Sequence, residues 1–147
     1  MKEPVWVLPE TVPALHERLL SEFGGAAGIR DAGMLESALS RPVHRLAYGS
    51  PNIPELAAAY AFGLVRDHPF VDGNKRIGFA TAILFLELNG YRFAATEVDA
   101  TVQTLALAAH DLDEAGYAAW LDANSKPLRS RLKRRKPRGQ RQSSSGT

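Results

Sequence analysis

Apolar residues recur along most of this chain at the three- and four-residue spacing of one face of an α-helix. In residues 10–23, for example, Val12, Leu15 and Leu19 form such a stripe, which ends at Gly24-Gly25. Comparable patterns, mostly bounded by capping or breaking residues, predict helices at residues 10–23, 32–40, 55–66, 75–88, 99–110 and 113–122. The chain is therefore predicted to be all-α.

Turn-forming residues separate these predicted helices. Asp31 is expected to cap the second helix, which should end before Pro42 because proline disfavours helical backbone at the residue before it. Residues 43–53 include Tyr48-Gly49-Ser50-Pro51-Asn52 and are predicted to be non-helical. An ordinary surface loop is one interpretation of this segment.

Charge divides the chain into two parts. Residues 1–124 contain all 16 acidic residues and nine of the 18 lysines and arginines, a net charge of −7, whereas residues 125–147 carry nine cations and no acid. The basic part has prolines, serines and almost no apolar residue, so it is predicted to be a disordered tail. We therefore expect one domain over residues 1–124 and a tail over residues 125–147. The tail is suited to weak, salt-sensitive contact with RNA or ribosomes, or merely to solubility, and its lack of aromatic residues argues against base stacking.

The composition excludes several classes of protein. The chain contains no cysteine, which rules out disulfides and thiolate metal sites. Its first residues lack the apolar core of a signal peptide, and no apolar run is long enough to span a membrane. We expect a cytoplasmic protein without a membrane partner.

The richest chemistry lies in residues 68–76, His-Pro-Phe-Val-Asp-Gly-Asn-Lys-Arg. His68 belongs to the residue type that titrates near neutral pH, so it can accept a proton from a hydroxyl nucleophile. Asp72 offers a hard oxygen ligand for Mg²⁺, although it could instead cap the following helix. Gly73 and Asn74 permit a tight turn that approaches a ligand closely. Phe70 is expected to enter the core and so to fix the positions of His68 and Asp72 on either side.

This loop leads directly into the predicted helix at residue 75. The free amides and the positive dipole end of a helix start favour an anion. Lys75 and Arg76 add two cations where the dipole disfavours them, so an anionic ligand would compensate. The segment therefore indicates phosphoryl chemistry with a base beside it. The other histidines, His16, His44 and His110, are expected to be structural or surface residues.

Residues 68–76 closely resemble the signature of the Fic/Doc (Fido) superfamily, and in particular its death-on-curing (Doc) branch, which has lysine where Fic adenylyltransferases have glycine. Further segments follow the Doc pattern in the same order, so that the resemblance covers roughly residues 4–122. These segments are Phe23-Gly24-Gly25, Gly28-Ile29-Arg30-Asp31, Leu35-Glu36-Ser37-Ala38-Leu39, Arg41-Pro42, Tyr48-Gly49 and Leu86-Glu87-Leu88-Asn89-Gly90-Tyr91.

The resemblance implies a helical bundle with a short flap hairpin, which would fall in residues 43–53 and clamp a target segment. It implies a type II toxin that transfers the γ-phosphate of ATP to a threonine of elongation factor Tu and arrests translation, with a Phd-like antitoxin as partner. His68 would be the general base and Asp72 the Mg²⁺ ligand. The nucleotide phosphates would contact Gly73, Asn74, Lys75 and Arg76, of which Lys75 and Arg76 would also assist catalysis. Arg66 would contribute another phosphate contact, although it is equally compatible with a surface charge at a helix end.

Two departures from the Fic pattern bear on which phosphate is transferred. Phe79 occupies the position of a second arginine in Fic adenylyltransferases, and Lys75 crowds the space an α-phosphate would use. Both favour a kinase over the alternative, a nucleotidyl transferase that adds AMP or UMP. An inactive Fido module that only binds is a third interpretation. No serine or threonine is followed four residues later by glutamate, the self-inhibitory pattern of many Fic proteins, so the inhibitor is expected to be a separate protein.

Overall fold

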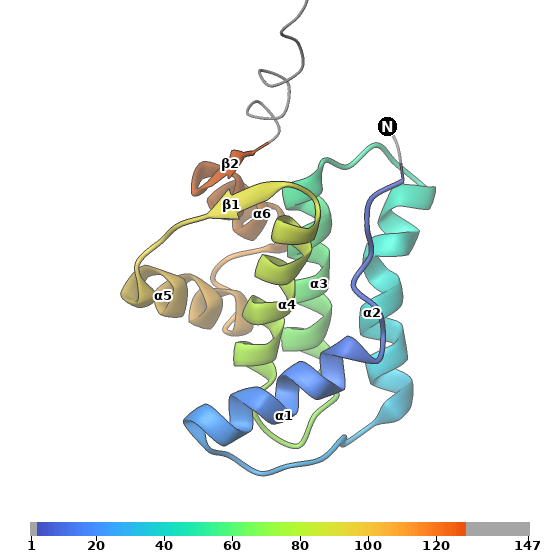
Figure 1. Cartoon of the computed structure of the whole chain (residues 1–147), viewed down its shortest axis with the longest axis vertical. Helices are drawn as coiled ribbons and strands as arrows, with labels where there is room; N and C mark the ends of the chain where they lie inside the picture. The colour runs from blue at the N-terminus through green and yellow to red at the C-terminus, as the bar shows by residue number, and fades with distance from the viewer. Residues whose placement is uncertain (1–2, 129–147) are drawn as a thin grey trace, which may run out of the picture.

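The computed structural model describes residues 3–128 and is predominantly helical (Figure 1). Its elements, in chain order, are α1 (Thr11–Phe23), α2 (Ala32–Ala47), α3 (Ile53–Asp67), α4 (Asn74–Leu88), β1 (Tyr91–Phe93), α5 (Glu97–Ala108), α6 (Glu114–Ala123) and β2 (Ser125–Pro127). Each predicted helix is present with its ends shifted by a few residues, except that α2 is considerably longer than expected. Within residues 3–128, no helix is both long and apolar enough to cross a membrane.

Helix α3 forms the centre of the bundle and packs against α2, α4 and α6. Because it is covered on nearly every side, its side chains are almost all apolar, and Leu56, Leu64 and Val65 are among those with 0–1% of their surface exposed. Figure 1 shows α3 and α4 side by side, with α1 crossing the end of this pair where the connecting loop turns. The segment of richest chemistry, residues 68–73, is that loop.

Two glycines allow close approach of the central helices. A Cβ atom on Gly63 would lie 3.1 Å from the Cα atom of Ala38 in α2, and one on Gly78 would lie 2.8 Å from Val65 Cγ2 and 3.2 Å from the carbonyl oxygen of Ala61 in α3. The α3–α4 crossing therefore leaves little room for a side chain at position 78.

Replacing Gly78 with alanine is expected to lower the free energy of unfolding by about 1–3 kcal/mol, because the added methyl group overpacks the α3–α4 contact. Gly33→Ala in the exposed first turn of α2 is the matched control, since its Cβ would lie 3.4 Å from its nearest neighbour. That variant should be neutral or stabilised by less than about 1 kcal/mol. Urea titration measures both, and equal midpoints for Gly78→Ala and the unmodified protein would contradict the prediction.

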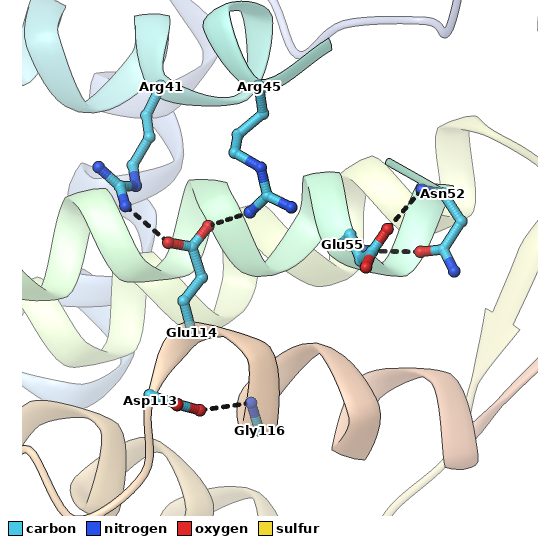
Figure 2. Close-up of polar contacts among 7 residues, drawn as sticks. All are labelled: Arg41, Arg45, Asn52, Glu55, Asp113, Glu114 and Gly116. Carbon is cyan, nitrogen blue, oxygen red and sulfur yellow. Dashed lines mark hydrogen bonds and ion pairs between the residues drawn. The ribbon is translucent and has the colours of Figure 1, made fainter. Parts of the chain in front are cut away.

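Local capping explains where several helices start. The side chain of Asp31 accepts a hydrogen bond from Met34 N at 3.0 Å, which confirms the predicted cap of α2. Asn52 and Glu55 form a reciprocal capping box at the start of α3, and the Asp113 side chain accepts from Gly116 N at 2.7 Å in α6 (Figure 2).

The predicted end of α2 before Pro42 is wrong, because the helix continues through this proline to Ala47. Proline in a helix interior removes one hydrogen bond, a loss that tertiary packing must outweigh. Pro42 is buried, and Arg41 and Arg45 reach across α3 to the carboxylate of Glu114 at 2.6 and 2.9 Å (Figure 2). These contacts stabilise the second half of α2.

The flap hairpin expected in residues 43–53 is absent from that segment. Residues 43–47 are helical, and the rest of the segment 43–53 contains no strand. The small antiparallel sheet of the described residues is instead formed by β1 and β2, in the register Tyr91↔Pro127, Arg92↔Lys126 and Phe93↔Ser125. A second extended contact, an isolated bridge, joins Ile29 to Phe70 beside the loop.

The same sheet changes the domain boundary. Residues 125–128 were predicted to belong to a disordered tail, but Ser125–Pro127 is strand β2 and Leu128 N donates to Gly90 O at 2.7 Å. This short segment is held by backbone pairing with β1 and Gly90, a long-range contact that local composition does not indicate. Residues 129–147, and with them most of the basic tail and its possible RNA or ribosome contact, lie outside the described residues.

Candidate active site

His68 ends α3 at the mouth of the loop and adopts the left-handed conformation, with φ 51° and ψ 54°. This conformation is unfavourable by about 1–2 kcal/mol for a residue with a side chain, so other contacts must hold it. Arg30 provides them, because its Nε donates to His68 O at 2.6 Å and its Nη2 to Asp67 O at 2.9 Å. The guanidinium thus satisfies carbonyls at the end of α3 and fixes the backbone of His68.

The imidazole of His68 is exposed, as a base that meets an external hydroxyl group must be. Its Nδ1 lies 3.3 Å from the carbonyl oxygen of Arg66. A carbonyl can only accept, so Nδ1 is the donor in this contact, and the neutral ring keeps its lone pair on Nε2. The arrangement suits His68 to accept a proton at Nε2.

Phe70 and Asn74 close the loop on itself. Phe70 is 1% exposed, which confirms that it enters the core. The Asn74 side chain accepts from Phe70 N at 2.9 Å and donates to Phe70 O at 3.0 Å. The sequence predicts that Asn74 contacts a nucleotide phosphate. Its carboxamide is buried and hydrogen-bonded within the loop, so only its backbone N–H group could make that contact.

Asp72 belongs to the loop and contacts the segment that follows α1. Its Oδ2 accepts from Ala26 N at 3.2 Å and its Oδ1 from Gly73 N at 2.8 Å. These two N–H groups, Ala26 first, lower the pKa of the Asp72 carboxyl below its ordinary value. Asp72 does not cap α4, whose N-cap is Gly73 without a side-chain hydrogen bond. The capping interpretation is therefore wrong, and the carboxylate is ionised and exposed.

The start of α4 supplies groups that could bind an anion. The first hydrogen bond of the helix runs from Ile77 N to Gly73 O at 3.0 Å. The backbone N–H groups of residues 74–76 therefore have no acceptor within the helix. Lys75 and Arg76 are exposed in this first turn, which has no acidic residue. Both ion pairs among residues 3–128 involve Glu114, so neither cation is held by an ion pair.

Aromatic rings hold two of the candidate cations. The guanidinium of Arg76 lies 4.5 Å from the ring centre of Phe23 at the end of α1. That of Arg66 lies 4.9 Å from the ring of Phe62, which Arg41 also contacts at 4.4 Å. Arg66 is therefore packed along α3 rather than free, and its phosphate contact stays a prediction.

Phe79 is one turn beyond Lys75 and belongs to an aromatic cluster. Its ring centre lies 5.8 Å from that of Phe93 and 6.3 Å from that of Trp120. The side chain at this position therefore packs against β1 and α6, and it has no group that could bind a phosphate.

The side chains of the site could bind Mg²⁺ only together with ligands from a nucleotide and water. Within the described part of the chain, no three histidine or acidic side chains gather to hold a metal ion. Mg²⁺ does not require such a group, since it commonly binds one or two carboxylates and takes its other ligands from substrate phosphates and water. Asp72 could hold Mg²⁺ in this way, as a complex with a nucleotide.

An extended segment flanks the loop on its outer side. Arg30 N and Asp31 N donate to Pro69 O at 2.7 and 3.0 Å, and Val71 N donates to Gly28 O at 3.0 Å. The strand-like backbone beside His68 is thus residues 28–31, between α1 and α2, and not the segment 43–53 expected from the sequence. Only the Gly28-Ile29-Arg30-Asp31 motif signalled these residues, and it did not indicate what they contact.

Fold and site together define a predominantly helical domain whose two central helices are joined at one end by a histidine-containing loop. The family model described as "Fic/DOC family" matches residues 6–86, which include the whole loop. This chain belongs to the Fic/DOC family.

Two relatives place the chain in the Doc branch of this family. It is 38% identical over 85 residues to "Protein kinase doc" of Escherichia phage P1, an alignment that covers 57% of this chain and 68% of that protein. It is 45% identical over 76 residues to "Toxin Doc" of Mycolicibacterium smegmatis, covering 50% of this chain and 58% of that protein. The chain thus spans less than two thirds of the length of the second relative.

Proposed function

We propose that this protein is a Doc-type toxin that acts as a protein serine/threonine kinase. In this proposal it transfers the γ-phosphate of ATP to a hydroxyl group of a translation factor similar to elongation factor Tu and so arrests translation. The observation that carries the proposal is the arrangement of the loop. His68, with the Nε2 lone pair of its neutral ring available, precedes an ionised carboxylate and a helix start whose two cations form no ion pair within residues 3–128.

The residues act in a single in-line transfer. Nε2 of His68 takes the proton of the target hydroxyl, its oxygen forms the new bond to the γ-phosphorus, and the bond to the β-γ bridging oxygen breaks to release ADP. Lys75, Arg76 and the amides at the start of α4 would stabilise the negative charge of the phosphates. Mg²⁺ on Asp72, when bound, would supply further charge neutralisation.

Positions 75 and 79 support phosphoryl rather than nucleotidyl transfer. Lys75 places a long cationic side chain at the helix start, and Phe79 is packed with Phe93 and Trp120 where the nucleotidyl transferases of the family have an arginine. The segment at residues 28–31, and not residues 43–53, would align the target segment, since its backbone lies next to His68 and a target segment could pair with it.

A separate antitoxin completes the proposal. The sequence has no self-inhibitory serine or threonine followed four residues later by glutamate, so a Phd-like partner would silence the protein. Growth arrest on expression of this chain alone, relieved by co-expression of such a partner, would support this part. Growth without arrest would contradict it.

The central test incubates the purified protein with elongation factor Tu, Mg²⁺ and ATP labelled at either the α or the γ position. Label that reaches the factor only from the γ position supports the kinase, whereas label from the α position indicates nucleotidyl transfer. If neither label is transferred, the proposed target or reaction is wrong. The His68→Ala variant identifies any label that arises without the site.

A further inference from the structure

We propose that His16 is a positioning residue that holds the centre of the catalytic loop, and with it Asp72, in the geometry needed for transfer; the kinetic part of this proposal rests on the proposed function. His16 lies in the middle of α1, outside the family signature in residues 68–76. It is 3% exposed, so it does not reach solvent as an ordinary surface histidine would.

His16 contacts the loop in two ways. Its Nε2 lies 2.7 Å from the carbonyl oxygen of Asp72, and because a carbonyl only accepts, Nε2 carries the proton. Its ring is stacked on Phe70, with ring centres 3.9 Å apart and an angle of 14° between the planes. The side chain of His16 thus holds both the buried Phe70 ring and the peptide that follows Asp72.

The hydrogen bond bears directly on the carboxylate of Asp72. The accepting carbonyl belongs to the Asp72–Gly73 peptide, whose N–H group donates to Oδ1 of Asp72 at 2.8 Å. Rotation of this peptide would therefore move the N–H group that orients the carboxylate. Gly73 has φ 76°, and a Cβ atom there would lie 3.5 Å from Nε2 of His16, so the turn and the imidazole are closely packed.

The other side-chain hydrogen bonds to the loop backbone hold different parts of it. Arg30 fixes the backbone of His68 at one end, and Asn74 joins Phe70 to the start of α4 at the other. His16 holds the peptide between them and connects it to α1, which packs against α4. A role limited to filling space would need only an apolar ring, whereas the donor at Nε2 is needed to satisfy the carbonyl and set the peptide plane.

Three full-length proteins separate these roles: the unmodified chain, His16→Phe and His16→Gln. Phenylalanine keeps a ring for stacking on Phe70 but removes the donor, whereas the glutamine amide can place an N–H group near the position of Nε2. With γ-labelled ATP and elongation factor Tu, His16→Phe is expected to lower kcat by about 100-fold with the KM for ATP changed less than about threefold. His16→Gln should keep kcat within about tenfold of the unmodified protein. Equal losses in both variants, or an unchanged kcat in His16→Phe, would overturn the positioning role.

Backbone amide hydrogen exchange tests the geometry without any assay of activity. The amides of Gly73 and Ala26, which donate to the Asp72 carboxylate, should exchange faster in His16→Phe than in the unmodified protein, and His16→Gln should restore most of their protection. Exchange at the original rate in His16→Phe would overturn the inference. If the unmodified protein transfers no label, the proposed kinase reaction fails, and the exchange rates alone then decide whether His16 positions the loop.

Discussion

Replacing His68 with alanine is expected to reduce phosphate transfer from ATP to its target by about 100- to 10,000-fold, the range that a general base contributes. The loss should be confined to the chemical step. The His68 imidazole is exposed and makes a single long contact through Nδ1, so its removal should leave the fold and the phosphate-binding amides in place. The dissociation constant for ATP should therefore change less than about threefold while kcat falls.

His44→Ala is the matched control, because it removes another exposed imidazole from the outside of α2. It should transfer phosphate at the rate of the unmodified protein. Titration calorimetry gives ATP affinity, and single-turnover transfer of γ-label gives the chemical rate. Retention of more than about a tenth of the rate in His68→Ala would show that another group accepts the proton.

The second large effect is expected at Asp72. Asp72→Asn removes the charge that would bind Mg²⁺, and the new amide can accept only one of the two hydrogen bonds that Ala26 N and Gly73 N now donate to the carboxylate. We expect transfer at saturating ATP to fall by about 100-fold and the concentration of Mg²⁺ needed for half-maximal rate to rise by at least about tenfold.

Asp111→Asn provides the comparison, since it makes the same change at an exposed acid between α5 and α6. Its rate and Mg²⁺ dependence should match those of the unmodified protein. Rates measured over a series of Mg²⁺ concentrations separate the two effects, because a loop disturbed only by the lost hydrogen bond would lower the rate equally at every concentration. A uniform loss of that kind would argue against Asp72 as the metal ligand.

Features of the site that depend on neighbouring residues were predictable from the sequence. The loop in residues 68–76 and the helix that follows it depend on residues close to one another in the chain, and the apolar ring of Phe70 was enough to predict its burial. The contacts that shape the loop were not predictable. Arg30 is 38 residues from His68 and His16 is 56 residues from Asp72, and no local pattern indicates that such distant groups meet.

The same division holds for the fold. Periodicity and capping determined the helices and the cap at Asp31, since both depend on interactions within one or two turns. The continuation of α2 through Pro42 depends on tertiary contacts, because the proline is buried and Arg41 forms an ion pair with Glu114. The pairing of Ser125–Pro127 with β1 likewise depends on tertiary structure. Capping hydrogen bonds and helical spacing involve residues close together in the chain, so the sequence predicts them directly. Packing across the bundle depends instead on which distant surfaces meet once the chain has folded.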